Sequence, residues 1–140
     1  MKMVDVVAEL ISVIPNMHRP AYDRCDADRM PNPNGAYTYG GCKYLANTGE
    51  KCWIGQLLRK PISNGHDLCG ALDAGGRRDV LCPDDVHTDS DHSRWRQFLL
   101  ALQGFHDSYS GDPGEDFHKY LRASLKEMAQ YYKIPTPDDF

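Results

Sequence analysis

Three stretches of the chain repeat apolar residues at spacings of three and four, which is the pattern of a helix with one buried face. The first stretch covers residues 3–14, and we expect Pro15 to end its helix. The second stretch covers about 91–109, and the third follows residues 112–115. The three apolar stripes consist of Val6, Val7, Leu10, Ile11, Ile14, Trp95, Phe98, Leu99, Leu102, Phe105, Tyr109, Phe117, Tyr120, Leu121, Leu125, Met128 and Tyr132.

Capping residues indicate where the last two helices begin. Ser90 or Asp91 can cap the second helix. Ahead of the third stripe, Asp112 is a capping residue, Pro113 takes the first helical position and Glu115 the third. Because only a short loop separates these two amphipathic helices, we predict an antiparallel αα-hairpin at the C-terminal end.

The pattern between the first and second helices is different. Prolines and turn residues punctuate residues 15–41, which favours a long irregular, proline-rich segment. Residues 42–45 and 51–54 alternate and flank the turn-rich run Asn47-Thr48-Gly49-Glu50, which predicts an antiparallel β-hairpin. The predicted fold class is therefore α+β, one small domain over residues 1–140 with an N-terminal helix, this β-hairpin and the αα-hairpin.

Composition narrows the class of protein. The chain has 140 residues, a formal net charge of -4 and 41% apolar residues, which is typical of one ordinary globular domain. The acidic balance argues against non-specific nucleic-acid binding, and no apolar run is long enough for a membrane span. The N-terminal residues lack the pattern of a secretory signal, and an odd number of cysteines, five, favours free thiols in a reducing cytoplasm.

Three cysteines and a histidine suggest a metal site. Cys42 and Cys52 would approach each other across the hairpin, and His66 and Cys69 are three residues apart, as on one helical face. Together they would offer zinc four nitrogen or sulfur ligands. Because the spacing matches no zinc ribbon or finger, buried free cysteines remain the alternative. Zinc is therefore a possible ligand, and we expect no other cofactor.

A glycine-rich run followed by two arginines suggests an anion site. Residues 70–76 could line a backbone nest, and the guanidinium groups that follow can fork onto a phosphate. The run lacks the ending of a P-loop, so a solvated turn is the alternative. The candidate ligand-binding residues, with aromatic rings that could stack a base, are Arg77, Arg78, Trp53, Tyr44 and His66.

No residue can be named as catalytic from the sequence. A cysteine thiolate would need a neighbouring base, and His66 or His106 could supply one, with Asp107 as its orienting partner. His106 lies near the end of a helix, where a capping or solvated histidine is the simpler expectation. We therefore favour a protein without enzymatic activity.

Two segments carry a resemblance to a known group of proteins. Residues 42–58, CKYLANTGEKCWIGQLL, and residues 98–107, FLLALQGFHD, resemble stretches of small uncharacterised accessory proteins of tailed phages and prophages. The resemblance implies a viral protein that acts in the host-cell cytoplasm, an inhibitor or sponge that binds and neutralises a host factor or a defence signalling nucleotide. The expected partner is a host protein or a small nucleotide, with no membrane, and the aromatic-rich terminal helices add a homo-oligomer as an expectation. A small cytosolic enzyme acting on a nucleotide signal and a zinc-stapled protein-interaction module remain the alternatives.

Overall fold

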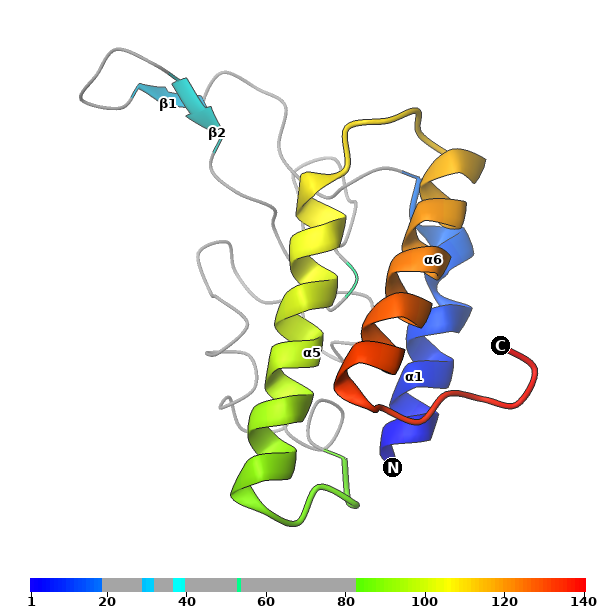
Figure 1. Cartoon of the computed structure of the whole chain (residues 1–140). Coiled ribbons are helices and arrows are strands. Elements are labelled where there is room, and N and C mark those ends of the chain that lie inside the picture. The colour runs from blue at the N-terminus through cyan, green and yellow to red at the C-terminus, as the bar shows by residue number, and fades with distance from the viewer. Residues whose placement is uncertain (19–28, 32–36, 40–52, 54–82) are drawn as a thin grey trace.

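Three helices form the core of the protein in a computed structural model, which describes residues 1–18, 29–31, 37–39, 53 and 83–140 (Figure 1). The C-terminal helices run antiparallel, and the first helix lies along the same bundle. The helical elements are α1 (Met3–Ser12), the 3-10 helix η1 (Ile14–Asn16), α5 (Asp89–Ser108) and α6 (Glu115–Tyr132). Two strands of three residues, β1 (Arg29–Pro31) and β2 (Tyr37–Tyr39), pair antiparallel with Arg29 opposite Tyr39.

The predicted α+β fold class is wrong for the described part of the chain, which is built from helices. Trp53, the one described residue of the hairpin expected over 42–54, is helical. A short apolar run cannot be assigned to a strand or to a buried helical turn by its periodicity alone. Trp53 takes the helical alternative, and the rest of the run lies outside the described residues. The short β1–β2 pair lies within the segment expected to be irregular. Among the described residues, no helix is long and apolar enough to cross a membrane.

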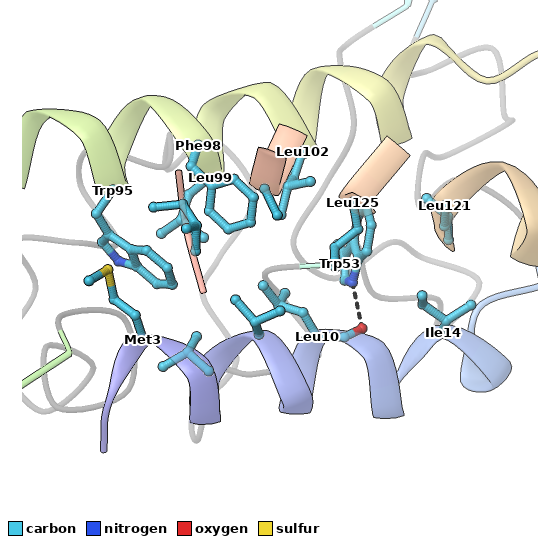
Figure 2. Packing of buried hydrophobic residues seen from close by; sticks show 14 of the residues in the cluster. Met3, Leu10, Ile14, Trp53, Trp95, Phe98, Leu99, Leu102, Leu121 and Leu125 are labelled. Carbon is cyan, nitrogen blue, oxygen red and sulfur yellow. Dashed lines mark hydrogen bonds between the residues drawn. The ribbon is translucent and has the colours of Figure 1, made fainter. Parts of the chain in front are cut away.

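The core lies where α1 faces α5 and α6 (Figure 2). The predicted stripes supply most of it, with Ile11, Tyr109, Tyr120, Met128 and Tyr132 only partly buried at its edge. Trp53 adds a fully buried indole, whose Nε1 donates a hydrogen bond to the carbonyl oxygen of Leu10 at 2.8 Å. This carbonyl belongs to the last turn of α1, where a helix leaves its own carbonyls without N–H partners. One side chain therefore fills the core and also satisfies the end of α1.

An acidic turn caps the first helix. The backbone N–H of Met3 donates to Asp85 Oδ1 at 2.9 Å, and the backbone N–H of Asp84 donates to the carbonyl of Met1 at 2.8 Å. Carboxylates next to a helix N-terminus satisfy its unpaired N–H groups and complement its dipole. The contact joins segments 82 residues apart in the sequence, so it attaches α1 to the start of the C-terminal half.

The α5–α6 hairpin is present, with different caps from those expected. Thr88, rather than Ser90 or Asp91, caps α5, and its Oγ1 accepts from the backbone N–H of Asp91 at 3.0 Å. Burial raises the pKa of the Asp91 carboxyl, but hydrogen bonds from the backbone N–H groups of His87 and Thr88 outweigh it and hold this pKa below its usual value.

Helix α6 begins at Glu115, two residues later than its sequence predicts. Its N-cap is Gly114, with φ of 81° and ψ of -127°, and not Asp112. This backbone conformation is not helical, so Pro113 lies outside the helix. The N–H of Gly114 donates to the carbonyl of His18 at 2.7 Å, and His118 Nε2 donates to the carbonyl of Met17 at 2.6 Å. The start of α6 is therefore attached to the chain that follows η1.

Candidate functional site

A hollow of about 250 Å³ lies on the surface between α1, α6 and the C-terminal segment. We call it the α1–α6 hollow. Apolar side chains line most of it, and three polar residues from three different elements also contribute. Its lining consists of Ala8, Ile11, Ser12, Arg122, Pro137, Asp139 and Phe140.

The C-terminal segment reaches this hollow because α6 ends in a tight reversal. Lys133 takes the left-handed conformation, with φ of 56° and ψ of 45°. The N–H of Ile134 then donates back to the carbonyl of Ala129 at 2.8 Å, and the Ile134 side chain is buried in the core. A further turn closes where the N–H of Phe140 donates to the carbonyl of Pro137 at 3.1 Å. After these contacts the chain runs past α1 to the C-terminus (Figure 1).

Arg122 is the principal cation of the hollow. Its guanidinium carbon lies 5.3 Å from the centre of the Phe140 ring, within the range of a cation–π contact. No carboxylate of the described residues forms an ion pair with Arg122, although Asp139 lines the same hollow. A guanidinium that is stacked but not neutralised can still bind an anion in a fork of two hydrogen bonds.

Arg122 also belongs to a row of cations along the exposed face of α6. Lys119, Arg122 and Lys126 follow each other at spacings of three and four, so they lie on one face over about 10 Å of helix. We call these three residues the α6 basic stripe. Lys119 Nζ lies 3.8 Å from Glu115 Oε1, a strongly exposed pair that water screens almost completely. The stripe is thus a local positive surface on a protein of net charge -4.

His106 and Asp107, the pair that the sequence suggested for acid–base chemistry, are in contact. His106 Nδ1 lies 2.9 Å from Asp107 Oδ1, and Gln103 Nε2 donates to the same oxygen at 3.0 Å. The His106 ring is fully buried and packs on Phe117 with 5.8 Å between ring centres. The expectation of a capping or solvated histidine is therefore wrong. The ring lies inside the core between α5 and α6 and presents no face to a substrate, while Asp107, its partner, is exposed.

Aromatic rings cluster around Phe117 and Tyr120 at this end of the hairpin. Tyr109 packs on Phe117 and on Tyr120, with ring centres 4.7 and 4.8 Å apart, and the hydroxyl of Tyr120 donates to the carbonyl of Phe105 at 2.7 Å. Burial raises the pKa of both tyrosine hydroxyls, so both stay protonated at neutral pH. This cluster supports the loop between α5 and α6, where the hydroxyl of Tyr109 donates to the carbonyl of Asp112.

Of the residues that the sequence suggested for ligand or metal binding, the structure describes Trp53 alone. Its indole is fully buried and hydrogen-bonded inside the core, where no face is open for stacking a base. The other candidates lie outside the described residues, and their roles stay predictions. They are Tyr44, His66, Arg77 and Arg78 for a ligand, and Cys42, Cys52, His66 and Cys69 for zinc. Among the residues with described positions, no group of three or more His, Cys, Asp or Glu side chains could hold a metal ion.

The hollow and the α6 basic stripe were not among the sites expected from the sequence. The spacing of Lys119, Arg122 and Lys126 contains the signal for the stripe, because positions three and four apart share a helix face. The hollow has no such signal, because it depends on where Asp139 and Phe140 fold back. No protein-family model matches the chain, and comparisons with curated proteins and with solved structures gave no match.

Proposed function

We propose that this chain is a phage-encoded accessory protein that acts in the host cytoplasm by binding and neutralising a host factor or a defence signalling nucleotide. The resemblance of residues 42–58 and 98–107 to small phage proteins supports the phage assignment. The surface of α6 supports binding as the mode of action. Recognition needs a surface that is exposed, rigid and chemically complementary to the partner. A helix whose inner face packs on the core holds its outer face in such a fixed position.

The observation that carries this proposal is the α6 basic stripe together with the hollow beside it. Three exposed cations on one helix face attract an acidic partner over about a Debye length, roughly 8 Å at physiological salt. The stripe is fixed to the core through the opposite face of the same helix, where Phe117, Leu121 and Leu125 are fully buried. A partner therefore meets positive charge that is already in place.

Native mass spectrometry tests the proposal directly. The chain is purified from infected and from uninfected bacteria at low salt, and its mass is measured before and after denaturation. We expect a bound host protein or an intact nucleotide, which denaturation releases unchanged. Chemical conversion of the released nucleotide would favour the enzyme alternative, and bound zinc would favour the zinc-stapled module. A chain that carries no bound protein, nucleotide or metal after purification from infected and from uninfected bacteria would refute the proposal.

A charge variant tests whether the captured protein or nucleotide binds at the α6 basic stripe. Lys126→Glu reverses one cation of the stripe, whereas Glu127→Lys changes charge at the neighbouring exposed position on a different face of α6. We expect Lys126→Glu to lose most of the captured species and Glu127→Lys to keep it. Equal capture by both variants would show that the partner binds elsewhere.

A further inference from the structure

We infer that the α1–α6 hollow is a nucleotide site, in which the hollow takes a base that carries an amino group and Arg122 takes the phosphate. This inference rests on the proposed function and names the chemistry of its ligand. It draws on three features of the described residues: the size and lining of the hollow, the exposed guanidinium at its edge, and the carboxylate that shares it.

The hollow suits a flat aromatic group. About 250 Å³ is close to the lower end of small-molecule sites, which run from about 300 Å³, and it is large enough for one base and part of a sugar. Ala8, Ile11 and Pro137 supply an apolar lining, and the ring of Phe140 supplies an aromatic surface. A base buried against such groups gains from apolar contact and from stacking, which is worth about 1–3 kcal/mol per base in single-strand binders.

The middle cation of the α6 basic stripe, Arg122, belongs to the lining of the hollow. Its guanidinium can bind two phosphate oxygens with two parallel N–H groups. Lys119 and Lys126 lie about one turn to either side on the same face of α6, at roughly 5–6 Å between Cβ atoms of neighbouring cations. A second phosphate of a dinucleotide or of a 5′-diphosphate would therefore meet a second cation.

Asp139 makes the site selective. Its carboxylate repels a phosphate, so it favours the orientation in which the phosphate lies on the α6 side and the base faces the C-terminal segment. Within the hollow, carboxylate oxygens only accept hydrogen bonds, so they pair with the exocyclic amino group of guanine, adenine or cytosine. Uracil has no amino group and offers only its ring N3–H, whose two flanking carbonyl oxygens repel a carboxylate. The geometry therefore assigns selectivity to Asp139 and affinity to Arg122.

The test measures the affinity of the full chain for GMP, AMP, CMP and UMP by calorimetry, with inorganic phosphate as the reference anion. The variants are Arg122→Gln, Asp139→Asn and the control Glu127→Gln, all three at exposed positions, and circular dichroism verifies that each remains folded. We expect at least one amino-bearing nucleotide to bind about tenfold more tightly than UMP, as for other sites that hydrogen-bond a base edge. Arg122→Gln should weaken every nucleotide about tenfold or more, since it removes a charged fork. Asp139→Asn should remove the preference over UMP, and Glu127→Gln should change neither.

Three results would overturn the inference. They are the absence of nucleotide binding at millimolar concentration, binding of inorganic phosphate as tight as that of the nucleotides, and nucleotide affinities that Arg122→Gln and Asp139→Asn leave unchanged. In each case the mass measurement on the intact chain still tests the proposed function. A captured host protein or nucleotide would support that function and would mean that the partner binds at another surface. If the intact chain captures nothing as well, both proposals fail.

Discussion

Two glycines near the α5–α6 loop should respond in opposite directions to the same substitution. Gly114, the N-cap of α6, has φ of 81° and ψ of -127°, a conformation that residues with a Cβ rarely adopt. Gly104 lies within α5, where φ is ordinary and where an added Cβ would meet no atom within 4 Å. We predict that Gly114→Ala destabilises the fold and that Gly104→Ala stabilises it.

The magnitudes follow from backbone conformation, because neither substitution causes a clash. An added Cβ at Gly114 would approach the His18 ring no closer than 3.8 Å, which is an ordinary van der Waals contact. The strained φ costs about 1–3 kcal/mol, and alanine recovers about 0.4–1 kcal/mol by restricting the unfolded chain, so the middles of these two ranges give a net loss of about 1–1.5 kcal/mol. At Gly104 the helix propensity of alanine adds about 1 kcal/mol. The free energies of unfolding of the two variants should therefore differ by about 2–2.5 kcal/mol.

Urea unfolding followed by circular dichroism at 222 nm measures both variants, with equal m-values required before the midpoints are compared. A neutral or stabilising Gly114→Ala would mean that the backbone at Gly114 is helical. Helix α6 would then begin at Pro113 with Asp112 as its cap, as the sequence alone suggests. The experiment thus decides between the two starts of α6.

Three further predictions concern helix ends. Trp53→Phe leaves the buried carbonyl of Leu10 without its donor and opens a gap in the core, so we expect a loss of about 2–4 kcal/mol in the same urea assay. Thr88→Ala removes the cap of α5 and should cost about 1 kcal/mol. The pKa of Asp91 is lower in the folded chain than in the unfolded chain. Its contribution to the free energy of unfolding is therefore complete above the ordinary carboxyl pKa and is lost as the pH falls through the pKa of Asp91 in the folded state. Asp91→Asn should therefore flatten the acid side of the stability profile in urea midpoints measured from pH 2 to 6, and an unchanged profile would contradict this.

The sequence was sufficient for the helices because their apolar stripes are local and long. The stripes over 3–14, 91–109 and 117–132 each extend over two or more turns, so the period of 3.6 is unambiguous. Each stripe packs on the core as predicted except at Phe105, which is only partly buried and lies outside the core cluster. The same spacing also indicates that His106 is buried, because it lies four residues after Leu102 on the same face of the helix. The polar character of a histidine favoured the solvated interpretation, but a hydrogen bond to Asp107 makes its burial tolerable.

The features that sequence reasoning missed depend on contacts between distant residues or on single dihedral angles. The acidic turn at Asp84 and Asp85 caps α1, which lies more than 80 residues away in the sequence, and no local pattern indicates that pairing. The start of α6 depends on φ at Gly114, because a proline followed by glycine suits a turn as well as a helix start. The hairpin prediction depended on two short runs, and such runs fit a strand or a helical turn equally.

The affinity of the α1–α6 hollow for a nucleotide should depend on the same difference between residues placed by a local helix and residues placed by distant contacts. Arg122 is carried by a helix whose opposite face is buried, so its backbone is ordered before any ligand arrives. Phe140 is held by the turn hydrogen bond to Pro137, by its contact with Arg122 and by packing against the core, whereas the Asp139 side chain is exposed. Among the described residues, no hydrogen bond or ion pair fixes the Asp139 carboxylate, so a ligand that contacts it must order this side chain and loses part of its binding free energy in doing so. The phosphate contact should therefore dominate affinity, and selectivity among bases should respond more strongly than affinity to changes in residues 134–139.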